Sequence, residues 1–333
     1  MAAFTVDDHI ASLFAEFCLV TGATEDEALE YLQKKDWQVV DAINLYFDTV
    51  ANQPDDMEAA AASLSAKDSC GGSTTQQQGE KKIKLVTWNI DGLDDKDLMH
   101  RTKAVCSTIE RLDPDIVFLQ EVIVDTASYI EKRCQRYKVL KTSNTAYFTA
   151  MMFKKSSVTI LSNSVQPFEN TTMMRMLQKV QVKCAGLDLL LMNSHLESTK
   201  EKHAERKEQF KIALEEMANA SRDTVVLFGG DTNLRDSEVS RMGGIPGGIV
   251  DLWELFGRPE DSKYTWDTQQ NNNLNWPYPN KPRIRFDRLF LRQAETASQV
   301  SLQTFKLIGN EWIAAVDRFP SDHFGIFCDF KVN

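Results

Sequence analysis

The sequence predicts an α+β fold of two packed β-sheets with flanking helices, preceded by a small helical module. Three observations lead to this class. Short apolar or alternating segments bounded by turn residues recur after residue 81, several follow one another without an intervening helix, and the first 50 residues carry only helical spacing. The length of 333 residues accommodates both parts, and 42% apolar residues exclude a wholly disordered chain.

Seven segments of the larger part are predicted strands. They are residues 83–88, 116–119, 146–153, 187–192, 224–228, 284–290 and 324–330. Residues 101–112 and 200–218 instead place apolar side chains at helical spacing. Because strands succeed one another without helices between them, a purely parallel doubly wound sheet is disfavoured.

Residues 1–50 are predicted to form three short helices, over 8–17, 26–33 and 39–47. The order Phe17, Ala28, Leu32, Asp36-Trp37, Ala42-Ile43, Tyr46-Phe47 resembles a ubiquitin-associated (UBA-like) domain. The resemblance implies binding of ubiquitin or ubiquitinated proteins, and a bundle that only packs is the alternative. Residues 51–80 are rich in Ala, Ser, Gly, Thr and Gln, which predicts a flexible linker before a domain spanning 81–333.

The charge is distributed unevenly along the chain. The first 80 residues hold 15 acidic and 3 basic side chains, a balance of −12, so the rest of the chain is near +2 and could carry basic patches that meet phosphates. No apolar run approaches the roughly eighteen residues of a membrane span, and no basic segment leads into an apolar core, so no membrane association is expected. The six scattered cysteines lack a C-x-x-C pair, which predicts reduced thiols.

Polar clusters lie at the ends of the predicted strands. They are Trp88-Asn89, Gln120-Glu121, residues 193–198, residues 229–235 and Ser321-Asp322-His323. Each cluster alone could be a turn or a solvated strand end. Taken together, their carboxylates, amides and two histidines match the needs of metal-assisted phosphodiester cleavage, because Mg²⁺ takes oxygen ligands and one or two carboxylates suffice.

At this point the chain resembles the endonuclease/exonuclease/phosphatase superfamily of DNase I-like phosphodiesterases. The matching motifs, in that family's order, are Thr87-Trp88-Asn89, Leu119-Gln120-Glu121, Ser194-His195-Leu196, Gly230-Asp231-Thr232-Asn233, Arg285-Phe286-Asp287 and Ser321-Asp322-His323. The resemblance implies a four-layered α/β/β/α sandwich over residues 81–333. Residues 87–93, 195–199, 230–236 and 264–268 are most similar to the 5′-tyrosyl-DNA phosphodiesterases, which implies release of a trapped topoisomerase II tyrosine from a DNA 5′ end, leaving a 5′-phosphate, in double-strand break repair.

The resemblance also implies roles for individual residues. Glu121 would be the main Mg²⁺ ligand, supported by Asn89 and Asp322, with Mn²⁺ able to substitute. Asp231 would orient and deprotonate the attacking water, and Asn233 would hold the nucleophile or a phosphate oxygen. His195 and His323 would donate to the phosphate as charge builds on it, and Asp287 would fix the tautomer of His323.

Substrate contacts are expected from basic and aromatic residues around the cleft. The expected set is Tyr147, Ser198, Lys200, Arg235, Trp266, Leu274 and Arg285. Tyr147, Trp266 and Leu274 match positions that line a channel for a single-stranded 5′ end. Lys200 stands where the family usually has Arg, so it keeps the charge and loses the bidentate fork. The expected partners are DNA with a 5′-tyrosyl or peptide adduct and topoisomerase II remnants, and the chain is expected to act as a monomer in nucleus and cytoplasm.

Two alternatives remain open at this stage. Another activity of the superfamily, such as that of an abasic endonuclease, a deadenylase or a phosphoinositide phosphatase, would use the same metal and carboxylates. Residues 195–199 and 264–266 argue against those activities. An adaptor that binds partners through residues 1–50 and uses the larger domain as a scaffold is the alternative from another class, although an intact set of catalytic side chains makes it unfavourable.

Overall fold

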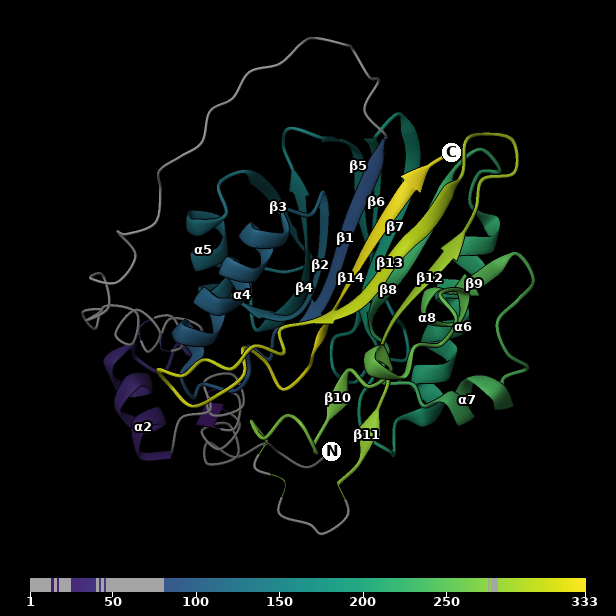
Figure 1. Ribbon diagram of the computed structural model, residues 1–333. Coiled ribbons are helices and arrows are strands. Elements are labelled where there is room, and N and C mark those ends of the chain that lie inside the picture. The colour runs from purple at the N-terminus through teal and green to yellow at the C-terminus, as the bar shows by residue number, and fades with distance from the viewer. Residues whose placement is uncertain are drawn as a thin grey trace, which may run out of the picture.

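Two six-stranded sheets face each other in a computed structural model of the chain, with helices on both outer faces (Figure 1). The structure describes residues 81–274, 276 and 281–333, together with residues 25–39 and the single residues 13, 14, 17, 42 and 45. One outer face is covered by α4 and α5, and the other by α6, α7 and α8. The predicted α+β class and the four-layered sandwich are therefore confirmed.

The first sheet has the strand order β13-β14-β1-β2-β4-β3. Its strands are β1 (Lys82–Asn89), β2 (Ile116–Ile123), β3 (Tyr137–Lys141), β4 (Tyr147–Lys154), β13 (Val300–Ile308) and β14 (Gly325–Val332). The second sheet has the order β5-β6-β7-β8-β12-β9. Its strands are β5 (Val158–Pro167), β6 (Met176–Cys184), β7 (Leu187–His195), β8 (Val225–Asp231), β9 (Ile249–Asp251) and β12 (Asp287–Arg292).

The remaining elements are helices and one short hairpin. The helices are α2 (Glu25–Lys34), α4 (Leu98–Leu112), α5 (Val124–Arg133), α6 (His203–Asn219), α7 (Asp236–Arg241), α8 (Leu252–Leu255) and the 3-10 turn Glu260–Ser262. The hairpin pairs β10 (Trp266–Asp267) with β11 (Arg283–Ile284) and lies at the lower end of the sandwich in Figure 1. None of the described helices is both long and apolar enough to span a bilayer.

Three apolar layers hold the sandwich together. The largest lies between the sheets and includes Leu85 and Phe118 from the first sheet and Leu189 and Leu227 from the second. A second layer joins the first sheet to α4 and α5, and a third joins the second sheet to α6. Removing this apolar surface from water is the main stabilising contribution, at about 25 cal/mol for each Å².

Buried amides replace the apolar side chains at one end of the inter-sheet core. Gln120 Nε2 on β2 donates to Asn193 Oδ1 on β7 at 2.9 Å, and Asn193 Nδ2 donates to the carbonyls of Leu119 and Ala150 at 3.2 and 3.0 Å. Each buried polar atom in this bridge finds a partner in the opposite sheet, so the bridge fixes how the two sheets lie relative to each other. The strand ends beyond it are thereby held in register.

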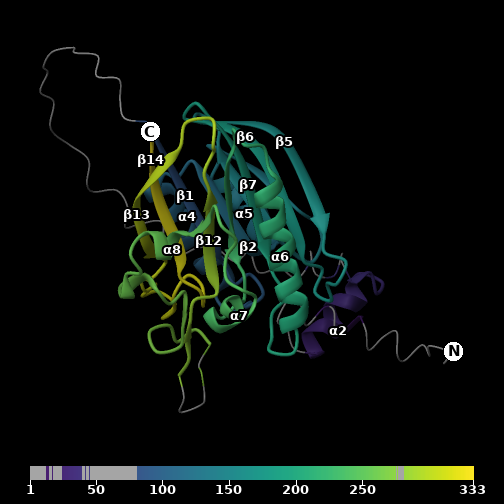
Figure 2. The same ribbon diagram turned by 90° about the vertical axis from the view of Figure 1, so that its right-hand side faces the viewer.

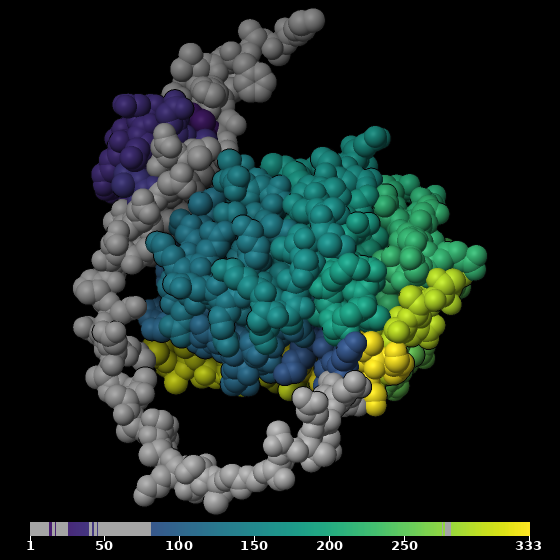
Figure 3. Space-filling view, turned by 90° about the horizontal axis from the view of Figure 1, so that it is seen from above, coloured from purple at the N-terminus to yellow at the C-terminus, as the bar shows by residue number. Residues whose placement is uncertain are grey.

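Strand direction brings the polar strand ends to this same end of the sandwich. β1 and β2 are parallel with Asn89 opposite Gln120, and β7 and β8 are parallel with His195 opposite Asp231. β12 and β14 run the other way and begin at this end. Figure 3 looks onto the opposite end, where the start of β1 lies beside the end of β14.

The seven expected strands are all present, but the sequence reasoning missed others. Strands β3, β5, β6 and β13 and helix α5 were not expected. The segment 284–290 is not one strand, because the chain leaves β11 at Ile284 and β12 begins only at Asp287. Arg285 therefore does not share a strand face with Asp287, contrary to expectation.

The described part of the N-terminal module is helical. α2 corresponds to the expected middle helix, and the described residues of the other two, such as Phe17 and Ala42, are helical as well. Their buried apolar cluster continues to Leu98 at the start of α4 and Ile123 at the end of β2. The rest of these helices and the predicted linker lie outside the described residues. The four described cysteines, Cys106, Cys134, Cys184 and Cys328, are buried free thiols, as expected.

Candidate active site

Residues from five separate stretches of sequence line one cavity at the amide-bridged end of the sandwich. The cavity has a volume of about 240 Å³, and its walls include Glu121, His195, Asp231, Asn233 and His323. Asn89 joins the group from below, because its Nδ2 donates to Asp231 Oδ2 at 3.0 Å. The structure therefore brings together the side chains for which the sequence predicts chemistry.

Glu121 reaches the cavity because strand β2 carries a β-bulge. The register with β4 shifts between Leu119 and Val122, and Glu121 has a left-handed backbone with φ 53°. Bulges re-aim a side chain at the end of a strand, as here. The Glu121 carbonyl accepts from the backbone N–H of Gly92 at 3.0 Å, and a Cβ added at Gly92 would lie 2.2 Å from this oxygen. The turn that follows β1 thus fits only a glycine.

Gly92→Ala is expected to lower the free energy of unfolding by about 1–3 kcal/mol, because the added methyl has only backbone to displace. The displaced backbone carries Glu121, so metal binding should weaken in the same variant. Chemical denaturation with and without divalent metal measures both effects. Gly243→Ala is the comparison, since a Cβ there meets no atom within 4 Å, and equal behaviour of the two variants would contradict the prediction.

Asp231 is held as an ionised carboxylate. Oδ2 accepts from Asn89 Nδ2, and Oδ1 accepts from the Asn233 backbone N–H at 3.0 Å. Burial alone would raise its pKa, but the facing imidazoles of His195 and His323 and these hydrogen bonds outweigh burial and lower the pKa below its usual value. Asp231 therefore offers an oriented, deprotonated oxygen to the cavity.

His195 is a neutral imidazole whose tautomer is fixed by Arg175. The Arg175 guanidinium lies 2.8 Å from His195 Nδ1, and a guanidinium can only donate, so Nδ1 accepts and the proton is on Nε2. Burial and the nearby Arg175 charge hold the pKa of His195 well below its usual value. The Nε2–H faces Asp231 Oδ2 at 3.3 Å and is available as a donor in the cavity.

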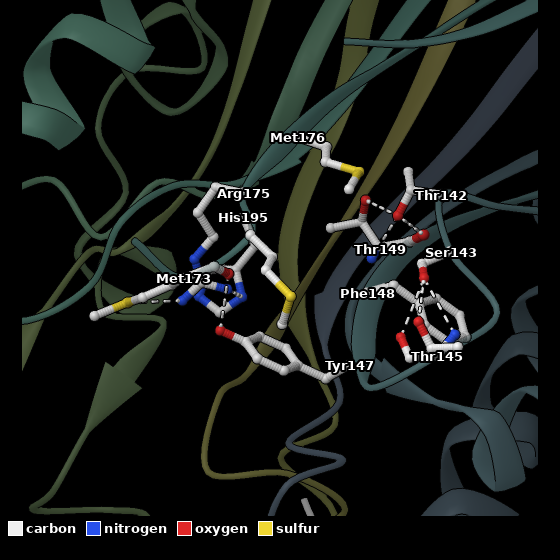
Figure 4. Close-up of a pocket in the computed structure, with 11 residues that line it drawn as sticks. Thr142, Ser143, Thr145, Tyr147, Phe148, Thr149, Met173, Arg175, Met176 and His195 are labelled. Atoms are coloured by element: carbon white, nitrogen blue, oxygen red, sulfur yellow. Dashed lines mark hydrogen bonds between the residues drawn. The ribbon is translucent and has the colours of Figure 1, made fainter. Parts of the chain in front are cut away.

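Arg175 and Glu197 are functional residues that the sequence reasoning missed. Figure 4 shows Arg175, His195 and Tyr147 grouped beside a neighbouring pocket, and the guanidinium lies over the Tyr147 ring at 5.1 Å. Buried Glu197 accepts from the N–H groups of Thr172 and Met173, at 2.6 and 3.0 Å, and so holds the loop that carries Arg175. Arg175 follows a polar, turn-like stretch without a motif, whereas Glu197 lay within the 193–198 cluster.

Arg175→Met is expected to raise the pKa of His195, because the charge that opposes its protonation is removed while the negative Asp231 stays. We expect the activity to fall by about 10²-fold, since the imidazole loses its fixed tautomer. NMR titration of His195 and the pH profile of the reaction measure both. Arg175→Lys, which keeps the charge, should leave the pKa of His195 low, and an unchanged pKa in Arg175→Met would refute this role.

His323 has the opposite electrostatic environment. Its Nδ1–H donates to buried Asp287 Oδ2 at 2.8 Å, and its Nε2 faces Asp231 at 3.8 Å and Asp322 at 4.0 Å. Burial disfavours the charged form, but these three carboxylates outweigh it and raise the pKa of His323 well above its usual value. His323 is therefore an imidazolium, and the cavity holds one neutral and one charged histidine.

The cavity suits a hard, oxygen-binding cation. Neither imidazole offers a free lone pair, because His195 Nδ1 already accepts and His323 carries both protons, so carboxylate oxygens are the available ligands. Burial and the neighbouring Asp322 carboxylate raise the pKa of Glu121 to about 7, which shows that negative charge is crowded there. A divalent cation would relieve this crowding. Asn89 Oδ1 already accepts from the Asp91 N–H at 2.9 Å, so the amide serves Asp231 and its turn first.

Most of the expected substrate-contact residues surround the cavity. Ser198, Arg235 and Trp266 line it, and Tyr147 lies edge-on to His195 with ring centroids 6.4 Å apart. Trp266 contacts Trp276 and Phe286 and donates to Asp322 Oδ2 at 3.2 Å. Leu274 is exposed on the nearby loop after β10, and Lys200 lies in an adjoining groove that Arg235 also lines.

Arg285 is the residue of this set that the structure does not bring to the cavity. Its guanidinium is 4% exposed, donates to Asp251 at 2.6 Å and Asp236 at 2.9 Å, and lies over the Trp253 ring. These contacts tie α7 and α8 to the second sheet. A guanidinium saturated by two carboxylates is not available to a phosphate, so Arg285 supports the fold instead.

Two family models match the chain. The endonuclease/exonuclease/phosphatase family matches residues 86–323, and a UBA-like domain matches residues 12–53. Among curated relatives, tyrosyl-DNA phosphodiesterase 2 of Xenopus laevis is 41% identical over 95% of this chain and 92% of its own length. The Homo sapiens protein of the same name is 40% identical over 96% of this chain and 92% of its own length.

Solved structures agree with the sequence relatives. The Danio rerio protein, crystallised with a single-stranded DNA product, superposes with a TM-score of 0.73 at 43% identity, over 75% of this chain and 99% of its own. The Caenorhabditis elegans protein gives a TM-score of 0.68 at 32% identity, over 99% of this chain and 95% of its own. Shared family motifs, a shared fold and this degree of identity lead to one conclusion: the chain belongs to the tyrosyl-DNA phosphodiesterase 2 family, within the endonuclease/exonuclease/phosphatase superfamily.

Proposed function

We propose that the protein hydrolyses the phosphodiester between the phenolic oxygen of a topoisomerase II tyrosine and the 5′ end of DNA, leaving a 5′-phosphate for double-strand break repair. The observation that carries this proposal is the grouping of Glu121, Asp231, His195 and His323 in one cavity of a chain with close relatives that bear this activity in their name. The single-stranded DNA product bound by the Danio rerio relative supports a DNA substrate.

Each side chain has a defined task in this reaction. Asp231, oriented by Asn89 and Asn233, accepts a hydrogen bond from the attacking water and takes its proton. The neutral His195 donates its Nε2–H to a phosphate oxygen. The His323 imidazolium, held by Asp287, places a positive charge beside the oxygens on which negative charge accumulates.

Mg²⁺ is the proposed cofactor, with Mn²⁺ as a substitute, and Glu121 with Asp322 would hold it. When bound, the ion neutralises charge on the phosphate and the leaving oxygen. A tyrosine phenol has a pKa near 10, far below that of an ordinary alcohol, so its oxygen leaves without a strong general acid. This agrees with the cavity, where His195 is neutral and Asp231 is ionised.

The two walls of the cavity differ in what they can bind. Trp266, Trp276 and Phe286 form an aromatic wall on which nucleic-acid bases can stack without sequence preference. The opposite wall carries Tyr147 and Arg175 beside His195. We propose that the DNA end lies along the aromatic wall and that the tyrosine leaves past Arg175, whose charge favours a phenolate.

A substrate comparison tests the activity. Purified full-length protein is offered a 5′-phosphotyrosyl oligonucleotide, an abasic-site duplex and an inositol polyphosphate, each with Mg²⁺ and with chelator. We expect metal-dependent cleavage of the first substrate. Preference for the abasic or inositol substrate would assign the protein to another activity of its superfamily, and no cleavage of any substrate would favour the adaptor alternative.

The N-terminal module supports a second, separate proposal. Its match to a UBA-like domain favours binding of ubiquitin, which a titration of labelled ubiquitin with the full chain tests. Failure to bind would leave packing or another partner as its role. We also propose a monomer present in nucleus and cytoplasm, to be checked by light scattering and by imaging of the tagged protein.

A further inference from the structure

A groove with basic walls lies between the start of α6 and α7, next to the cavity. Its volume is about 520 Å³, and its basic lining residues are Lys200, His203, Lys207, Arg235 and Arg241. Figure 2 shows α7 beside one end of α6, at the end of the sandwich where the cavity opens. Arg235 lines both the groove and the cavity, so the two are continuous.

The acidic residues of the groove are already engaged. Glu238 accepts from Arg206 Nη2 at 2.7 Å and from the Arg235 backbone N–H at 2.8 Å. Hydrogen bonds from its own backbone and from Thr199 lower the pKa of Glu201, so that carboxylate also has partners. Neither carboxylate is therefore free to neutralise the lysines across the groove.

Three of the basic side chains have no counter-ion. Lys200, Lys207 and Arg241 form no ion pair with any described residue, whereas Lys202 and Lys211, on the same helix or at its start, pair with Glu205 and Glu215. Unpaired cations that gather around one groove create a positive potential. The expected ligand is an anion with several charges.

The spacing and chemistry of the walls fit a nucleic-acid backbone. His203 and Lys207 are one helical turn apart, about 6 Å along the axis, and Arg241 faces them from α7. None of the described lining residues is Phe, Tyr or Trp, so the groove offers no platform for bases. A row of phosphates fits these walls, while bases are served by the aromatic wall around Trp266.

We propose that this groove binds the sugar–phosphate backbone of the DNA beyond the nucleotide that carries the reacting phosphate. The inference rests on the proposed function, because it assumes that the reacting phosphate occupies the cavity. Arg235 then marks the point at which the strand passes from cavity to groove. The phosphates can belong to the continuing 5′ strand or to its complement.

The test neutralises two groove residues outside the catalytic machinery, in the variant Lys207→Gln/Arg241→Gln of the full chain. Binding of a fluorescent 5′-phosphorylated 15-nucleotide strand, and of a duplex with a 5′ overhang, is measured by anisotropy at several salt concentrations. We expect Kd to rise about tenfold at low salt, and the slope of log K against log salt to fall by roughly 1.4 for the single strand, since two phosphate contacts are lost.

The control variant is Lys138→Gln/Lys183→Gln, which changes the net charge equally. Both lysines lie at the other end of the sandwich, because Lys138 pairs with Phe153 and Lys183 with Asp188 in the strand registers. We expect wild-type binding from this control. An equal loss of affinity in both double variants would reduce the effect to overall charge and overturn the proposal.

Catalysis on a minimal substrate separates the groove from the reaction itself. With 5′-phosphotyrosyl thymidine, the groove variant should keep kcat/KM within about twofold of wild type, while kcat/KM falls for the 15-nucleotide substrate. A loss confined to the duplex assigns the phosphates to the complementary strand, and a loss with the single strand assigns them to the 5′ strand. Unchanged binding of both oligonucleotides would overturn the proposal. If wild type binds both but cleaves no phosphotyrosyl substrate, the proposed function fails and the groove result stands.

Discussion

Asp231→Asn is expected to lower kcat by about 10³-fold, with little change in the affinity for product DNA. The amide matches the carboxylate in shape, so the cavity keeps its form, but it cannot take a proton from the attacking water. Single-turnover cleavage of a 5′-phosphotyrosyl oligonucleotide measures the rate, and anisotropy with the 5′-phosphorylated product measures binding. Full activity of this variant would remove Asp231 from the mechanism.

The role given to Asn89 follows from the same measurement. Asn89 Nδ2 donates to Asp231 Oδ2, so Asn89→Ala should cost less than Asp231→Asn, and should cost little more once Asp231 has been replaced. Such non-additivity is typical of residues that act as one unit. Independent effects that multiply in the double variant would place Asn89 elsewhere, for instance on the metal as the sequence predicts.

Glu121→Gln is expected to weaken metal binding by at least 100-fold and to lower activity at limiting metal accordingly. An amide oxygen is a weaker ligand than a carboxylate and carries no charge to offset that of the cation. Isothermal titration with Mn²⁺ as the probe, and activity against metal concentration, measure the two effects. Asp188→Asn, a surface carboxylate at the far end of β7, is the matched control and should behave as wild type.

The same variant should alter stability in a pH-dependent way. In the metal-free protein the pKa of Glu121 is raised from 4.5 to about 7, so the folded state retains a proton that the unfolded chain releases. Stability is therefore lost as the pH rises from about 4.5 to about 7, and metal restores it. Glu121→Gln should lose less stability over this interval and gain little from metal. Thermal unfolding at pH 5 and pH 8 measures this, and identical pH dependence of the two proteins would contradict it.

The reach of sequence reasoning differs between parts of the site. Asn89, Glu121 and Asp231 could be predicted because each follows an apolar strand, and strand ends meet at one edge of a sheet. The turn after β1 and the bulge in β2 supply the final placement, and both depend on backbone conformations that the residue pattern does not encode. The pattern therefore located the side chains without giving their geometry.

Arg175 and Arg285 show where this reasoning stops. Arg175 reaches His195 only because a loop between β5 and β6 is tied to Glu197, a contact between residues 24 and 25 positions apart. Arg285 lay in a segment that resembled one strand, but the chain breaks there and the guanidinium turns to Asp251 and Asp236. Both outcomes are set by long-range packing, which local alternation of polar and apolar residues cannot reveal.

The position of β14 has a consequence for how the protein matures. This strand, the last of the described strands, lies between β1 and β13, and His323 directly precedes it by two residues. During synthesis β1 has no partner on that side until residues 325–332 have left the ribosome. We expect nascent chains that stop before β14 to be inert and prone to aggregate through the open edge of β1, so that a newly made enzyme becomes competent only after translation has passed this strand.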